Sequence, residues 1–193
     1  MFTFSSSSSI GFACTPICGG YSWSWASVVY KLLEEVEARF GGRDKSFTFV
    51  GIEFTSGDVS QIWFPGSSKF VAIQLTDDAR LDCNRALFQL AHEMIHLLAP
   101  AVGHLAPVLE EGLATAFSHE VAQRQGSSFR AGIPSYERAA ELTNRLLELN
   151  PHAISQMRAI EPSFRRITPD LINSVVPTLD PQVSYDLCAN FVR

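Results

Sequence analysis

Residues 92–96 read His-Glu-Met-Ile-His, inside a longer stretch, 82–99, whose sequence is DCNRALFQLAHEMIHLLA. Helical residues four positions apart lie one above the other on the same face. On a helix from Asp82 to Ala99, His92 and His96 would therefore present two imidazoles to one point, with Glu93 about 100° further round. This spacing suits a zinc ion bound by two histidines, with an acid beside it that holds a water molecule.

The apolar residues of this stretch are expected on the opposite side of the helix from the histidines. At about 100° per residue, Arg85, Phe88, Gln89, His92, His96 and Ala99 share one face. The opposite stripe, which we expect to be buried, contains Cys83, Leu87, Leu90, Ala91, Met94, Leu97 and Leu98. Histidines outside the buried stripe indicate a site, and the alternative is a surface helix that carries two histidines by chance.

The third ligand distinguishes the classes of zinc site. A metzincin has a glycine and a histidine at the positions that Ala99 and Val102 hold here, so that class is excluded, and His104 comes two residues too late. Cys83 would lie about 180° from His92 on the same helix and could not reach the metal. An acid on a second helix remains, because 108–125 has a helical pattern with a proline in its first turn.

That second helix carries Glu-Glu-Gly-Leu-Ala at 110–114, and neighbouring helical residues point apart, so only one of the two glutamates can face the metal. Together with His-Glu-Met-Ile-His, this segment resembles the gluzincin metallopeptidases, over about residues 69–120. The resemblance implies one zinc ion, Glu111 as the third ligand, and close helix packing at Gly112 and Ala114. Glu110 departs from the asparagine usual there, and the gap before Glu111 is short. If Glu110 does not bind metal, we expect it to be a solvated acid near a helix N-terminus.

The rest of the chain predicts an α+β fold. A helical pattern covers 24–40, and three strands follow at 47–54, 59–64 and 69–75. Short turns between these strands predict an antiparallel three-stranded meander packed on helices. Further helices are expected at 135–149, 154–160, 169–176 and 181–192. The resemblance implies that these elements have a zincin-like fold. We expect three units, which are a serine-rich arm (1–20), a catalytic core (21–125) and a helical lobe (126–193).

The resemblance also implies where a substrate would lie. In such enzymes the strand before the site helix borders the cleft, and a peptide binds along it as an extra strand. The equivalent here is the strand at 69–75, whose alternative reading is an ordinary internal strand.

The chemistry expected of this site is hydrolysis of a peptide bond by a zinc-activated water, with Glu93 as general base. An oxyanion donor is also needed. Tyr136 and His152 are the first candidates, because they follow the ligand helix, and the others are His104, His119, Arg130 and Tyr185. Thr115, one turn after Glu111, is a candidate hydrogen-bond partner behind the ligands. The alternative functions are a catalytically idle binding or regulatory protein and a zinc hydrolase with a non-peptide substrate.

Composition narrows the possible partners. The chain has 193 residues, 46% of them hydrophobic, and a formal net charge of −5 with no basic patch, which argues against nucleic acid. No apolar stretch approaches the roughly 20 residues of a membrane span. The first twenty residues contain no lysine or arginine, unlike a signal peptide, so we expect a cytoplasmic protein. We expect reduced thiols at the four cysteines, which are Cys14, Cys18, Cys83 and Cys188.

Overall fold

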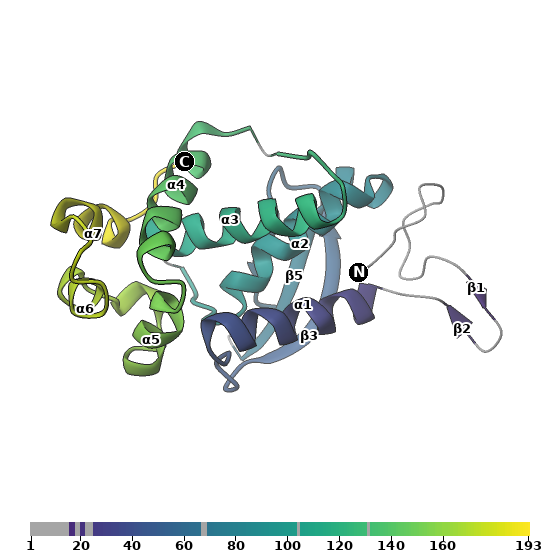
Figure 1. Ribbon diagram of the computed structural model, residues 1–193. Coiled ribbons are helices and arrows are strands. Elements are labelled where there is room, and N and C mark those ends of the chain that lie inside the picture. Colours follow the sequence, from purple (N-terminus) through teal and green to yellow (C-terminus); the bar gives the residue numbers. More distant parts are fainter. Residues whose placement is uncertain (1–15, 18–19, 22–24, 67–68, 104, 131) are drawn as a thin grey trace.

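The computed structural model describes residues 16–17, 20–21, 25–66, 69–103, 105–130 and 132–193 (Figure 1). Within them the fold is α+β, as predicted. The strands are β1 (Pro16–Ile17), β2 (Gly20–Tyr21), β3 (Thr48–Thr55), β4 (Gln61–Trp63) and β5 (Phe70–Thr76). The helices are α1 (Trp25–Phe40), α2 (Cys83–His96), α3 (Val108–Arg124), α4 (Pro134–Leu149), α5 (Ala153–Ile160), α6 (Pro169–Val175) and α7 (Pro181–Cys188). Most of the predicted N-terminal arm lies outside the described residues.

The three-stranded sheet is mixed, with the strand order β3-β5-β4. β5 pairs in parallel with β3 and antiparallel with β4, where Ile62 faces Ile73. The predicted antiparallel meander is therefore wrong, because the chain crosses the end of β5 on its way from β3 to β4. The connection 56–60 makes this crossing possible, since five extended residues span about 16 Å. Two strands on either side of a third are only about 10 Å apart.

β5 is the central strand, and its alternate side chains form the buried face of the sheet. Val71, Ile73 and Leu75 have no exposed surface. On the outer face, the side chains of Gln61, Gln74 and Glu53 are linked by hydrogen bonds across all three strands. Since β5 has a neighbour along each edge, the predicted binding of a peptide along 69–75 is wrong. Within the described residues, β4 pairs only with β5, and it lines the same cavity as the two histidines.

Helix α2 packs against β5, and α1 and α3 lie beside α2 (Figure 1). The helix begins after Asp82, whose carboxylate accepts a hydrogen bond from the backbone N–H of Arg85. The predicted apolar stripe is buried except at Cys83, which is partly exposed in the first turn. Burial of this stripe holds α2 in one rotation about its axis, with His92 and His96 directed away from the main core.

Helices α4 to α7 follow the predicted segments, with one correction at the end of the chain. α7 ends at Cys188, not at residue 192, because the following backbone is extended and pairs with the start of α3. There the N–H of Val108 donates to the carbonyl of Ala189, and the N–H of Phe191 donates to that of Ala106. We call residues 189–193 the C-terminal segment.

One hydrophobic core extends from α1 through the sheet to α7, and the predicted domain boundary after residue 125 stays a prediction. Within the described residues, no helix combines the length and apolar character needed to cross a membrane. Cys188 is a free thiol, while Cys14 and Cys18 lie outside the described part of the chain.

Candidate metal centre

Three side chains from two helices meet at one point between α2 and α3. Nε2 of His92 lies 3.2 Å from Nε2 of His96 and 3.2 Å from Oε2 of Glu111. The third distance, from Nε2 of His96 to the same oxygen, is 3.7 Å. Ligand atoms at zinc bond lengths of about 2.0–2.1 Å in a tetrahedral site are roughly 3.3 Å apart. The separations and the donor set, two imidazole nitrogens and a carboxylate oxygen, therefore fit a zinc ion.

Glu110 lies behind this cluster. Its Oε1 is 2.8 Å from Nδ1 of His96, and its side chain is only 3% exposed. The expectation of a solvated acid is wrong, because the turn of α3 that directs Glu111 to the cluster directs Glu110 to the back of His96. With Nδ1 bonded to Glu110, Nε2 of His96 is directed at Glu111. Metal-binding histidines usually have such a carboxylate partner on the ring nitrogen that does not bind the metal. That general rule, applied to two adjacent glutamates, was the sequence signal that could have identified Glu110.

The charges of the cluster support one another. Burial alone would lower the pKa of His96, but the carboxylates of Glu111 and Glu110 outweigh burial and raise this pKa well above its usual value. Burial alone would likewise raise the pKa of Glu111, yet His96 and His92 hold it below the ordinary range. The ionised carboxylate and the two imidazoles lie together in a partly buried cluster, and such a cluster favours the binding of a cation.

Glu93, between the two histidines, is buried beneath the cluster. Burial raises its pKa, although His96, His92 and the hydroxyl of Ser60 each act to lower it. Oγ of Ser60 donates to Oε1 of Glu93 over 2.7 Å. Ser60 directly precedes β4, so this contact depends on the crossing connection between β3 and β4. The sequence held no signal for it.

Of the two predicted oxyanion donors, the structure brings only Tyr136 to the cluster. The ring of Tyr136 lies 5.7 Å from that of His92 and 4.7 Å from that of Phe191. Burial and the nearby Glu111 raise the pKa of Tyr136 to about 12, which keeps the phenol protonated as a donor. His152 is exposed before α5 and lines neither cavity of the site.

The remaining candidates take other positions. The hydroxyl of Thr115 donates over 2.8 Å to the backbone carbonyl of Glu111, and it bonds neither histidine. His119 is 3.3 Å from Glu137, and Tyr185 is 61% exposed on α7. Arg130 lines a cavity beside the cluster, and His104 lies outside the described residues.

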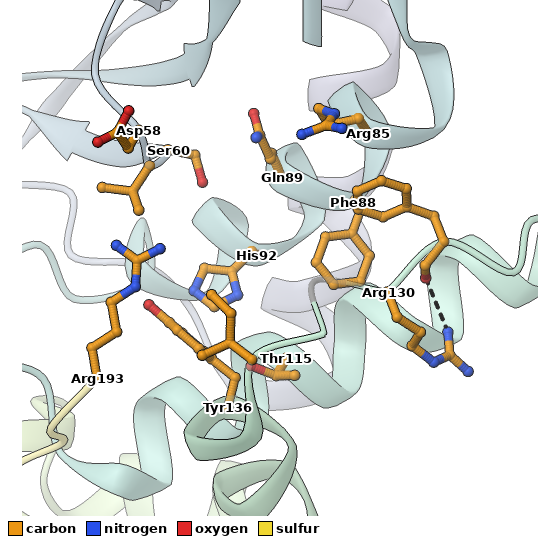
Figure 2. Close-up of a pocket in the computed structure, with 13 residues that line it drawn as sticks. Asp58, Ser60, Arg85, Phe88, Gln89, His92, Thr115, Arg130, Tyr136 and Arg193 are labelled. Atoms are coloured by element: carbon orange, nitrogen blue, oxygen red, sulfur yellow. Dashed lines mark hydrogen bonds between the residues drawn. The ribbon is translucent and has the colours of Figure 1, made fainter. Parts of the chain in front are cut away.

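Two cavities adjoin the cluster. One, of about 440 Å³, is lined by the three candidate ligands and Glu93. Strand β4 and the residues Pro100, Ala101, Leu105 and Ala106 also line it. The other, of about 290 Å³, begins at His92 and extends toward Phe88 (Figure 2). Arg193 lines both cavities. The helix expected at 181–192 gave no indication that an extended C-terminal segment would reach them.

Comparison of the chain with protein-family models, curated proteins and solved structures finds no match. The residues and their geometry therefore carry the functional interpretation.

Proposed function

We propose that this chain is a zinc-dependent peptidase with a zincin-like fold, in which His92, His96 and Glu111 hold one zinc ion. The observation that carries the proposal is the separation of the three ligand atoms, which is 3.2, 3.2 and 3.7 Å. A zinc ion supplies a Lewis acid that polarises a carbonyl and lowers the pKa of water to about 7.

The side chains around the cluster have separate roles in this proposal. Glu93 takes the proton of the attacking water and returns it to the leaving amine. Ser60, bonded to Oε1 of Glu93, leaves the other carboxylate oxygen for this transfer. Glu110 fixes the tautomer and orientation of His96. The protonated phenol of Tyr136 donates a hydrogen bond to the oxyanion that forms on the substrate carbonyl.

A peptide substrate fits along β4. This edge strand borders the larger cavity through Gln61 and Ile62, opposite Glu93 and the histidines. Its outer backbone groups are available for an added strand, because β4 pairs only with β5 within the described residues.

Zinc content and cleavage of a peptide library test the proposal together. We expect one zinc per chain by elemental analysis, and cleavage that a chelator abolishes and zinc restores. Glu93→Gln should keep the metal and lose activity by at least about a hundredfold, since it removes the base. As a matched control, Glu141→Gln changes an exposed glutamate on α4 and should leave cleavage unaltered.

Each alternative predicts a different result. A catalytically idle protein would bind zinc and cleave nothing, and a non-peptide hydrolase would show chelator-sensitive activity on esters or other amides alone. A Glu93→Gln variant that retained full activity would refute the mechanism.

A further inference from the structure

The smaller cavity continues directly from the candidate metal centre. It has a volume of about 290 Å³ and shares Val59, Ser60, His92, Tyr136 and Arg193 with the larger cavity. Figure 2 shows His92 and Tyr136 close together and Phe88 further along the lining, and Phe129 also lines this cavity. A substrate residue next to the cleaved bond can therefore extend from the cluster into this space.

One wall of this cavity is apolar. The rings of Phe88 and Phe129 pack edge to face with centroids 5.2 Å apart, and Ile133 lies on the same lining. Such a wall accepts the methylene groups of many side chains, so it provides contact area with little discrimination.

The charged groups of this cavity are mostly guanidinium groups. Arg85, Arg130 and Arg193 line it, and Asp58 is the one carboxylate among its described lining residues. Arg85 already lies 3.6 Å from Asp82. Among the described residues, neither Arg130 nor Arg193 forms an ion pair, and Arg130 bonds only the carbonyl of Phe129. These arginines make the potential of the cavity locally positive although the whole chain has a net charge of −5, and a positive potential attracts anions.

Arg193 is held at this position by the fold. Two backbone hydrogen bonds tie the C-terminal segment to the start of α3, from Val108 N–H to Ala189 O at 2.9 Å and from Phe191 N–H to Ala106 O at 2.8 Å. The ring of Phe191 is buried against Tyr136. These anchors place Arg193 among the residues that line both cavities, and Figure 2 shows it in the lining of the smaller one.

We propose that this cavity binds acidic side chains of the substrate, so that the site prefers peptides with glutamate or aspartate beside the cleaved bond. Arg193 pairs with a carboxylate, and Arg130 extends the positive potential. Arg130 and Arg193 are exposed, and a wholly apolar side chain in the cavity would cover part of each guanidinium without replacing the water that it displaces. A carboxylate replaces those lost hydrogen bonds with charge-assisted ones. The position of the cleaved bond rests on the proposed function.

A matched set of fluorescent peptides tests this preference. The peptides carry glutamate, glutamine or lysine at the residues flanking the bond that the zinc-loaded protein cleaves, or along a fixed library scaffold if it cleaves none. Binding is measured by anisotropy with the full-length Glu93→Gln variant in zinc buffer. We expect the glutamate peptide to bind about tenfold more tightly than the glutamine peptide, the effect of one charge-assisted hydrogen bond in a partly solvated site. The preference should shrink as salt is added.

Variants assign the preference to the cavity. Arg193→Gln should remove most of it, Arg193→Lys should keep part of it, and Arg130→Gln should reduce it. Arg145→Gln removes the same charge from an exposed position on α4 and should have no effect. Equal binding of glutamate and glutamine peptides, or a preference unchanged in Arg193→Gln, would overturn the inference. A preference without any cleavage would leave the inference standing and refute the proposed peptidase.

Discussion

Removing the carboxylate of Glu110 should weaken zinc binding although Glu110 is not one of the candidate ligands. Its bond to Nδ1 of His96 is 2.8 Å long and almost fully buried. A buried hydrogen bond to a charged group contributes about 1.5–3 kcal/mol, which corresponds to roughly ten- to a hundredfold in affinity, the usual effect of losing such a partner. We expect Glu110→Ala to reach the upper part of this range, because His96 also becomes free to rotate.

The amide variant separates charge from hydrogen bonding. In Glu110→Gln, the amide oxygen can still accept the bond from His96, but its NH₂ group takes the position of Oε2, which has no partner among the described residues. An unpaired buried donor costs about 1–3 kcal/mol. That cost falls on the fold with or without zinc, whereas a neutral amide accepts a weaker hydrogen bond from His96 than a carboxylate does, so we expect an intermediate loss of about tenfold in zinc affinity.

The assay is competition for zinc against a chromophoric chelator, with circular dichroism to verify the fold of each variant. Glu141→Ala, which removes an exposed carboxylate from α4, is the control for net charge. Wild-type zinc affinity in a folded Glu110→Ala variant would refute the role of Glu110. Failure of the wild-type protein itself to bind zinc would instead refute the metal centre.

Three further predictions test the packing and the chemistry. Gly112→Ala should destabilise the fold by about 3 kcal/mol in urea unfolding, because its Cβ would overlap the backbone carbonyl of Ala139; an unchanged midpoint would contradict this close approach. Arg158→Met should cost about 3–5 kcal/mol, since its guanidinium donates to five backbone carbonyls. The exposed Arg145→Met control should stay within about 0.5 kcal/mol of wild type, and a similar result for both arginines would exclude the proposed role of the buried one. Tyr136→Phe should lower kcat by roughly a hundredfold with little change in KM or melting temperature, and a change in KM alone would assign the phenol to substrate binding.

Helix positions were predictable from the sequence because they depend on neighbouring residues. The 3.6-residue period and the apolar stripe predict α2 to within a few residues, and the burial of that stripe determines where His92 and His96 point. Helix α3 was predictable in the same way, so the two elements that carry the candidate ligands were both expected.

Strand order was not predictable by the same means. Strands β3, β4 and β5 match the expected segments, but short connections were taken to imply hairpins. The connection 56–60 instead crosses β5, and only competition among the strands for the buried central position decides between these arrangements. The contact of Ser60 with Glu93 and the exposed edge of β4 both follow from that choice.

Local geometry alone places the two histidines on one helix face, with Glu93 about 100° further round, because residues i and i+4 of a helix lie one above the other. The surroundings of the histidines depend on long-range packing. It brought Glu111 and Glu110 to opposite sides of His96, left His152 at the surface, and placed Arg193 beside Tyr136. These contacts join residues far apart in the chain, and they depend on how buried faces pack together, which no local pattern encodes.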